Sequence, residues 1–325
     1  MAQAGGLRYP MPAYNPPMAR IVVPEAEALL EQPISVLDKG FVRLVDYMGG
    51  DSRIVAAARV SYGAGTKTAR EDCALIEYLL RNGHTSPFEQ VVLTFHCKLP
   101  IFVARQWIRH RTARVNELSG RYSVMRDEFY LPADERVQFQ SEESKQGSAE
   151  PMPEAFAHDV VERLQSEQQA LYLTYEGLLS AGVARELARI NLPLSLYTEW
   201  YWQIDLHNLF HFLRLRLDPH AQHEIREYAK GLARCAQAVA PLAYGAFEEY
   251  VLKGASFSAS EIALLRKMVE QAGLTSDSRL GKLTELTAAR LREFKRKLWG
   301  EPLATELPDF TPADRGDEPG PAPGA

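Results

Sequence analysis

The chain has 325 residues, of which 46% are apolar and 24% charged, a composition that can bury a large core and excludes a disordered protein. Its formal charge of -5 excludes the strongly basic class that coats nucleic acids, so any anion site must be local. The three cysteines stand far apart without a CxxC spacing, which argues against a disulfide scaffold or a structural zinc site. A reducing, cytoplasmic setting is expected.

Residues 1–33 are expected to form a flexible leader, because prolines interrupt them and no apolar run has the length of a signal peptide. No stretch reaches the roughly 18 uncharged apolar residues that span a bilayer, so we expect no membrane partner. Regular structure is predicted to begin near Ile34 with a strand through GFVRLVDYMGG, where apolar side chains alternate. A short helix capped by Asp51 and a helix over residues 70–82, stopped by Gly83, are predicted next.

The alternation in VVLTFHCKLP predicts a second strand ended by Pro100. Cys97 lies on its apolar face and is expected to be a small buried hydrophobe rather than a nucleophile. Residues 101–112 return to helical spacing and lead into a polar loop, VNELSGRYS, and residues 134–153 predict a surface excursion or a mobile loop.

Helices are then predicted over residues 154–180, in a short segment to Asn191, and over residues 206–217 and 221–252. The predicted core domain, residues 34–254, is therefore α+β: a helix-rich single domain around an antiparallel or mixed sheet. Residues 255–300 predict a charged helical appendage, and the Pro/Gly-rich residues 301–325 predict a disordered tail.

The densest polar cluster is ARQWIRHRTARVNELSGRYS, residues 104–123, whose basic residues are all arginine: Arg105, Arg109, Arg111, Arg114 and Arg121. Planar guanidinium groups bind phosphate and carboxylate oxygens through two hydrogen bonds, which a lysine cannot do. Helical spacing would aim Gln106 and Arg109 at one ligand and His110 and Arg111 at another. Ser119, Gly120 and Arg121 carry the parts of a phosphate cradle.

Arginine-rich helix faces are commonly solvated or paired with acids across a subunit boundary, and that plain interpretation stays open. Against it, Val103, Trp107 and Ile108 make the segment partly buried. Buried arginines need anionic partners, and Glu117 is the only acid that the segment offers.

Two further groups of polar residues stand out. His84, Ser86 and Glu89 follow the helix stop at Gly83, where Ser86 most simply caps a helix. The other group lies in and directly around the helix predicted over residues 206–217 and consists of Asp205, His207, His211, Arg216, Asp218 and His220. His207 and His211 have the i,i+4 spacing of zinc sites, but the glutamate that follows the first histidine in such sites is missing, so no metal is expected.

The triplet Arg109-His110-Arg111, followed after seven residues by Ser119, resembles the RHRx7S signature of flavin-dependent thymidylate synthases. The likeness continues in order over residues 34–254, through LDKGFVRLVDYMG, AARVSY, LIEYLLRNGHTSPFE, FHCKLPIFVARQW, ARINLPLSLYTEWYW and LRLRLDPHAQHEI. It implies the fold of thymidylate synthase-complementing proteins and an enzyme that makes dTMP from dUMP. It further implies 5,10-methylenetetrahydrofolate as one-carbon donor, reduced FAD regenerated by NADPH as hydride source, and a homotetramer with active sites at subunit boundaries.

The resemblance also implies roles for individual residues. Around dUMP it places Gln106, Arg109, Glu117, Ser119, Gly120, Arg121, Arg189 and Arg216. Arg216 is implied to be catalytic, because it would contact the uracil edge and favour ionisation at N3 in place of a cysteine nucleophile. Around FAD it places Ser61, Ser86, Glu89, Arg109, His110, Arg111, Glu117, Asp205, His207 and His211, with His84 near the flavin and folate rings. Asp205, His207 and His211 depart from the Asn, Arg and Asn of the family.

Two other functions remain as alternatives. A nucleic-acid-binding module could use the arginines of residues 105–121 together with Trp200, Tyr201 and Trp202, but the net charge of -5 opposes it. A phosphohydrolase is weakened by the absence of a paired-carboxylate metal motif.

Overall fold

The computed structural model describes residues 20–60, 69–142, 147–280 and 286–300 and divides into two compact units, Met1–Gly254 and Ala255–Ala325. Residues 1–19 of the predicted leader, the predicted FAD residue Ser61 and the predicted tail lie outside the described residues. Regular structure begins earlier than predicted, with α1 (Pro24–Glu27) and β1 (Pro33–Val36). Tertiary contacts order this segment: the Tyr47 hydroxyl donates to Glu27 (2.5 Å) and accepts from the Val23 amide (2.9 Å).

A five-stranded sheet in the order β1-β2-β3-β7-β4 forms the centre of the first unit, and every neighbouring pair is antiparallel. Its other strands are β2 (Gly40–Met48), β3 (Val92–Pro100), β4 (Arg114–Glu117) and β7 (Tyr197–Asp205). The predicted α+β class and both predicted strands are confirmed. Strand β4 was predicted as a loop; all four of its residues are exposed, and it is extended because it pairs with Gln203 to Trp200 of β7.

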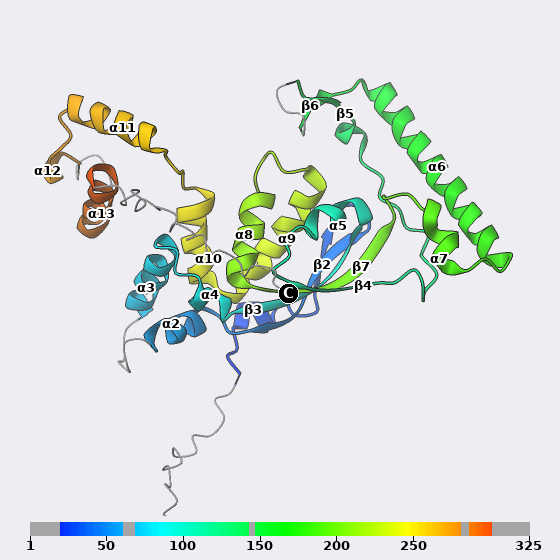
Figure 1. Cartoon of the computed structure of the whole chain (residues 1–325), viewed down its shortest axis with the longest axis horizontal. Coiled ribbons are helices and arrows are strands. Elements are labelled where there is room, and N and C mark those ends of the chain that lie inside the picture. Colours follow the sequence, from blue (N-terminus) through cyan, green and yellow to red (C-terminus); the bar gives the residue numbers. More distant parts are fainter. Residues whose placement is uncertain (1–19, 61–68, 143–146, 281–285, 301–325) are drawn as a thin grey trace, which may run out of the picture. The chain divides into compact units, whose positions relative to one another are not determined.

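Helices α5 (Ile101–Trp107), α8 (Leu206–Arg216) and α9 (His223–Val239) pack against the sheet (Figure 1). Between them and the strands lies an aromatic core in which the Trp107 ring centroid is 5.1 Å from those of Trp202 and Phe212. Cys97 is fully buried there, as predicted. The predicted helix over 221–252 is instead broken at Ala240 (φ -142°), because Pro241 cannot continue a helix and restricts the residue before it.

Five short elements gather at one end of this unit: α2 (Asp51–Arg59), α3 (Ala69–Arg81), α4 (Ser86–Glu89), α10 (Pro241–Phe247) and a π-helical turn (Glu248–Leu252). Gly83 stops α3 as predicted, with a φ of +68° that an L side chain rarely adopts. The prediction that Asp51 caps its own helix was wrong. Its carboxylate accepts instead from the Leu242 and Ala243 amides (2.8 and 3.0 Å) and so caps α10.

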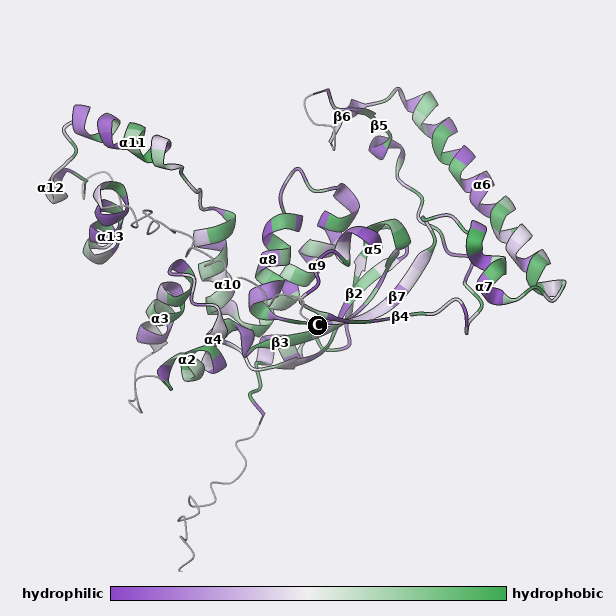
Figure 2. Cartoon of the chain, viewed as in Figure 1, coloured by the Kyte–Doolittle hydropathy of each residue, from purple (hydrophilic) through white to green (hydrophobic). Residues whose placement is uncertain are grey.

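Residues 134–153 were predicted as a surface excursion or a mobile loop, and the described residues form a surface excursion with regular structure, none of it buried. It holds a 3-10 turn (Asp134–Arg136) and a hairpin of β5 (Gln138–Gln140) and β6 (Ser148–Pro151), whose strands pair with each other. The long helix α6 (Glu154–Ser180) follows as predicted, with α7 (Arg185–Ala188) and a 3-10 turn (Arg189–Asn191) after it. Figure 2 shows apolar and hydrophilic residues mixed around α6.

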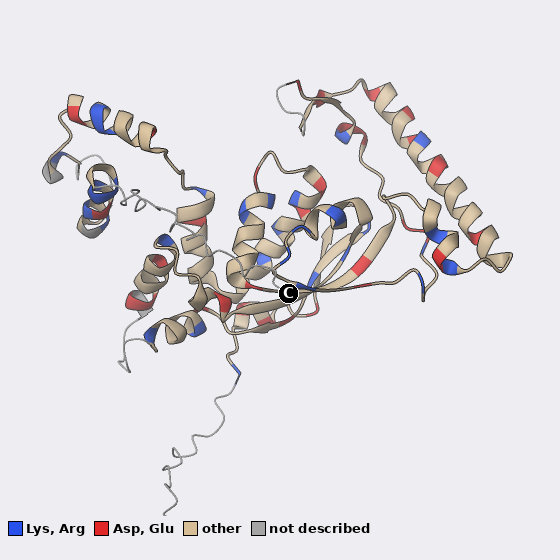
Figure 3. Ribbon diagram, viewed as in Figure 1, with Lys and Arg blue, Asp and Glu red and all other residues tan. Residues whose placement is uncertain are grey.

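The second unit contains α11 (Ala259–Gln271), α12 (Asp277–Leu280) and α13 (Ala288–Trp299). Arg266 of α11 holds the end of α13 by donating to the carbonyls of Leu298 and Gly300. Figure 3 shows how many Lys and Arg residues α13 carries. In the part of the chain that the structure describes, no helix is long and apolar enough to cross a membrane.

Candidate active site

A pocket of about 340 Å³, here called the Arg216 pocket, opens where the end of α5 meets β7 and α8. It is lined by Arg109, His110, Arg111, Thr112, Ile204, Asn208, His211, Leu215 and Arg216. The structure thus brings together the whole Arg-His-Arg triplet and two of the predicted residues, His211 and Arg216, from a segment about a hundred positions later in the chain. Thr112 and Asn208 had not been predicted; Asn208 is adjacent to His207, which was the only sequence signal for it.

A hydrogen bond from Arg216 Nε to His110 Nε2 (3.1 Å) ties the two sides of this pocket together. Because a guanidinium can only donate, His110 must accept through Nε2 and carry its proton on Nδ1. Burial, the Arg216 charge and His211 lower the pKa of His110 to about 4, which keeps the ring neutral near pH 7. Burial also lowers the pKa of Arg216, because a desolvated guanidinium has lost stabilising water.

The expected helical arrangement of the arginines was wrong. Helix α5 ends at Trp107, so Arg109, His110 and Arg111 lie beyond it and line one pocket instead of two opposite helix faces. Their expected burial was wrong as well, since Arg109 and Arg111 are exposed in this chain. Neither has a hydrogen bond or ion pair with any residue that the structure describes, which leaves both guanidinium groups available to an anionic ligand.

A second pocket of about 180 Å³, the His84 pocket, lies on the other side of His211 and is largely apolar. It is lined by Leu80, Gly83, His84, Thr85, Phe88, His207, Phe210, His211, Arg214, Phe247 and Val251. The structure therefore brings His84, His207 and His211 together, as the resemblance implied. A flat apolar ring fits the His84 pocket, and negatively charged groups fit the free guanidinium groups of the Arg216 pocket.

Four other predicted FAD residues, Ser86, Glu89, Glu117 and Asp205, do not line either pocket. Ser86 and Glu89 are exposed on α4. Asp205 is the N-cap of α8, where its carboxylate accepts from the backbone amide and the side-chain amide of Asn208 (2.9 and 2.8 Å). A structural capping role thus accounts for this acid.

The residues predicted to hold phosphate lie near one another and outside both pockets. A Cβ added to Gly120 would lie 3.1 Å from Arg189 Cδ and 2.8 Å from Met125 Sδ, so Arg189 packs directly on this glycine. Ser119 Oγ accepts from the Arg121 amide (3.3 Å), and the Arg121 guanidinium pairs with Glu186 (3.2 Å). These residues are brought together as predicted, but none of them lines the Arg216 pocket.

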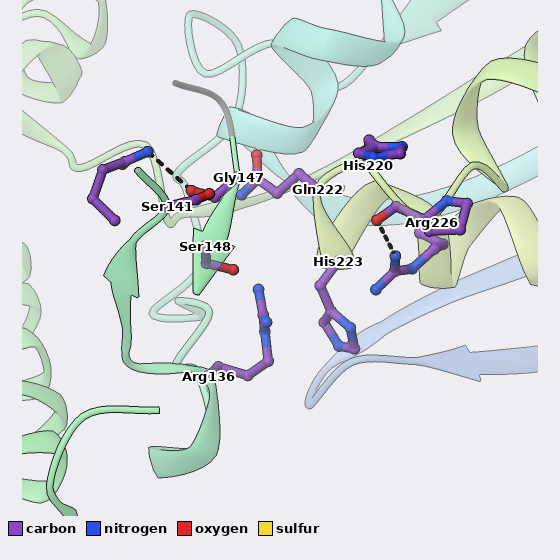
Figure 4. Close-up of a pocket in the computed structure, with 11 residues that line it drawn as sticks. Arg136, Ser141, Gly147, Ser148, His220, Gln222, His223 and Arg226 are labelled. Carbon is purple, nitrogen blue, oxygen red and sulfur yellow. Dashed lines mark hydrogen bonds between the residues drawn. The ribbon is translucent and has the colours of Figure 1, made fainter. Parts of the chain in front are cut away.

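Two more predicted nucleotide residues have partners of their own. Glu117, on β4, accepts from the Thr198 hydroxyl (2.8 Å). Gln106, on α5, donates from Nε2 to Gln222 Oε1. Gln222 lines a third pocket of about 580 Å³, the His223 pocket, between the β5–β6 hairpin and the start of α9 (Figure 4). Sequence reasoning missed Gln222, although it lies within the LDPHAQHEI segment.

Two of the three cysteines, Cys97 and Cys235, are buried. Burial raises the pKa of Cys97 well above its ordinary value and that of Cys235 to about 12, so neither thiol provides a thiolate near pH 7. Of the described residues, no three His, Cys, Asp or Glu side chains are arranged to hold a metal ion.

Known proteins share this fold and sequence. The family model for thymidylate synthase complementing protein matches residues 43–242. A flavin-dependent thymidylate synthase of Treponema denticola is 57% identical over 270 residues, covering 83% of this chain and 98% of that protein. The enzyme of the same name from Thermus thermophilus is 54% identical over 271 residues, covering 82% and 96%.

A solved structure is also similar to this chain in fold and sequence. The UMP/dUMP methylase PolB from Streptomyces cacaoi, bound with 5-Br dUMP, is 31% identical with a TM-score of 0.62, covering 67% of this chain and 98% of that one. Residues 43–242 contain every residue that lines the Arg216 pocket, and all those that line the His84 pocket except Phe247 and Val251. The chain belongs to the family of flavin-dependent thymidylate synthases.

Proposed function

We propose that the protein is a flavin-dependent thymidylate synthase that converts dUMP to dTMP. The observation that carries the proposal is the Arg216 pocket, in which a desolvated guanidinium is held by a neutral histidine beside two unpaired arginines. The relatives support it, since their names state the activity and PolB was solved with a dUMP analogue.

FAD is the proposed cofactor, with Arg109, Arg111, His84, His207 and His211 as residues that would hold it. When bound, FAD supplies the hydride that reduces the transferred one-carbon unit, and the proposed co-substrates are 5,10-methylenetetrahydrofolate and NADPH. The described residues fit such a group, because an apolar pocket adjoins a cationic one through the shared residue His211.

Arg216 would activate the nucleotide electrostatically. A guanidinium beside the uracil edge stabilises negative charge that develops on the ring, and its effect is largest where water is excluded. Since Arg216 is tied to His110, it need not reorganise when that charge appears. Burial of Cys97 and Cys235 leaves neither thiol free to act as a nucleophile in its place.

Ser119 is proposed to bind phosphate rather than to attack. Its hydroxyl accepts from the Arg121 amide, and no described histidine or carboxylate forms a hydrogen bond with it that could remove its proton. Glycine at 120 would let the phosphate approach the backbone, with Arg121 and Arg189 neutralising its charge.

The separation of the cradle from the Arg216 pocket within one chain leads us to propose a homotetramer. A nucleotide that uses both would lie between the pocket of one subunit and the cradle of another. The active sites would therefore form at subunit boundaries, as the resemblance to the family implies.

The test is an anaerobic assay on the purified protein. Its visible spectrum is recorded with FAD, then with NADPH, and then with dUMP and 5,10-methylenetetrahydrofolate, and dTMP is measured by chromatography. We expect a flavin spectrum that NADPH bleaches and the complete mixture restores, with dTMP formed in proportion. A protein that holds flavin but forms no dTMP and releases no C5 proton from dUMP would disprove the proposed reaction.

A further inference from the structure

The carboxylate of Glu224 is almost completely buried and lines neither the Arg216 pocket nor the His84 pocket. Its exposed fraction is 4%, in the first turn of α9. Burying a charge is costly unless hydrogen bonds replace the lost water, and Glu224 has three donors. Tyr130 Oη and Arg136 Nη2 donate to Oε1 at 3.0 and 3.4 Å, and Gln222 Nε2 donates to Oε2 at 2.8 Å.

The hydrogen bond from Gln222 connects the buried Glu224 to an exposed residue that also contacts Gln106. Paired with the Arg136 guanidinium, Glu224 is a carboxylate and can only accept. Gln222 must therefore turn its NH2 group toward Glu224, which points its carbonyl the other way. Gln106 donates Nε2 to that carbonyl. The buried charge of Glu224 thus fixes the orientation of the Gln222 amide, which in turn fixes that of the Gln106 amide. Without these partners, either amide could turn either way.

We propose that Glu224 is a positioning residue for the nucleotide, acting through Gln222 to fix how Gln106 faces dUMP. The inference rests on the proposed function, because the place of Gln106 at dUMP is what the resemblance to the family implies. Held this way, Gln106 has one N–H and its carbonyl oxygen left for a ligand. This donor and acceptor can bind a ligand group that offers both an acceptor and a donor, such as the edge of a uracil ring or a sugar hydroxyl. Phosphate is a poorer partner, because its oxygens mainly accept hydrogen bonds.

The competing explanation is that Glu224 only stabilises the fold. Through Tyr130 and Arg136 it holds the segment before the β5–β6 hairpin against α9, and Arg136 lies in one wall of the His223 pocket (Figure 4). The two roles use different oxygens of the same carboxylate. Tyr130 and Arg136 contact Oε1, while the path to Gln106 leaves from Oε2.

Four variants of the full-length, FAD-loaded protein distinguish the structural role of Oε1 from the positioning role of Oε2. Glu224→Gln removes the charge that orients Gln222, Tyr130→Phe removes only a bond to Oε1, and Gln106→Ala removes the last link. The fourth variant combines Glu224→Gln with Gln106→Ala. The dissociation constant for dUMP is measured by calorimetry, together with Tm, bound FAD, KM and kcat.

We expect Glu224→Gln to weaken dUMP binding by about five- to tenfold, the range of one lost oriented hydrogen bond, and to raise KM more than it lowers kcat. Tyr130→Phe lowers Tm but keeps dUMP affinity within about twofold, since the path through Oε2 is intact. The double variant binds no more weakly than Gln106→Ala alone, because both changes break the same path.

Equal weakening by Tyr130→Phe and Glu224→Gln, or fully additive losses in the double variant, would overturn the proposal in favour of a purely structural role. If Glu224→Gln does not fold, Gln222→Ala breaks the same path at an exposed residue and must give the same result. Wild-type protein that does not bind dUMP refutes the proposed function itself. Wild-type binding that Gln106→Ala leaves unchanged refutes only the positioning role.

Discussion

Arg216 and Arg121 are both proposed to contact the same nucleotide, yet they lie in opposite surroundings. Arg216 is partly buried at the end of α8, where burial lowers its pKa and the uncharged His110 ring orients it. The Arg121 side chain is 58% exposed and is paired with Glu186 in water. The comparison shows that position decides what an arginine can do: a desolvated, oriented charge acts strongly on a reacting group, whereas a screened one mainly binds.

Removal of the buried arginine should have the largest effect. We expect Arg216→Ala to lower kcat for dTMP formation by about 10²- to 10³-fold, as when one preorganised charge-stabilising donor is lost. Bound FAD, measured by its absorbance, should remain. Arg163→Ala is the control, because Arg163 is 78% exposed on α6 and should leave kcat unchanged. A fall of less than tenfold for Arg216→Ala would remove this arginine from the chemistry.

Substitution of Gly120 by alanine should have the next largest effect on dTMP formation. In Gly120→Ala the new Cβ would lie 2.8 Å from Met125 Sδ and 3.1 Å from Arg189 Cδ, so Met125 must move and Arg189 must yield slightly. We expect KM for dUMP to rise about tenfold, the cost of weakening one charged contact, with kcat much less affected.

The matched control is Gly177→Ala. Gly177 lies within α6, and a Cβ there meets nothing within 4 Å. Alanine should leave KM unchanged and stabilise the helix by about 0.5–1 kcal/mol. A similar rise of KM in both variants would mean that the cradle does not depend on close packing of Arg189.

The neutral histidine beside Arg216 predicts how stability changes with pH. The pKa of His110 is lowered to about 4 in the fold, while an unfolded histidine titrates near about 6.5. Between these values the unfolded chain binds the extra proton, so this contribution to stability is complete above about pH 6.5 and is lost as pH falls toward about 4.

We therefore expect Tm to fall over this range, and to fall less steeply in His110→Gln, whose amide oxygen can accept from Arg216 without titrating. Thermal melts at several pH values measure the slope. His220→Gln is the comparison variant, since the His220 side chain is 89% exposed and lines neither the Arg216 pocket nor the His84 pocket. An identical slope in His110→Gln would show that His110 is not the group that titrates.

Breaking the surface ion pair should have the smallest effect. Glu186→Gln removes the partner of Arg121, and we expect the free energy of unfolding to change by less than about 1 kcal/mol in urea melts. The affinity for dUMP should rise slightly, because the Arg121 guanidinium no longer has to give up its contact with Glu186 to bind the nucleotide. A loss of several kcal/mol would mean that the exposed pair is structural and would weaken the contrast with Arg216.

Local patterns in the sequence were enough for several elements. Alternating apolar residues defined β2 and β3, the helical pattern gave α6 with its bounds, and Gly83 marked the end of α3. The apolar strand face placed Cys97 in the core. Each of these follows from which side chains one element buries, and that information lies within about ten neighbouring residues.

Other features depend on residues far apart in the chain, and only the tertiary structure decided them. Asp51 caps α10 rather than its own helix, β4 is a strand because β7 pairs with it, and α5 stops at Trp107. The sequence by itself identified the family, the arginine triplet and Arg216, but not the bond between Arg216 and His110 or the path from Glu224 to Gln106. Both connect side chains more than a hundred residues apart, and whether two such groups meet depends on the packing of whole helices, which no local pattern encodes.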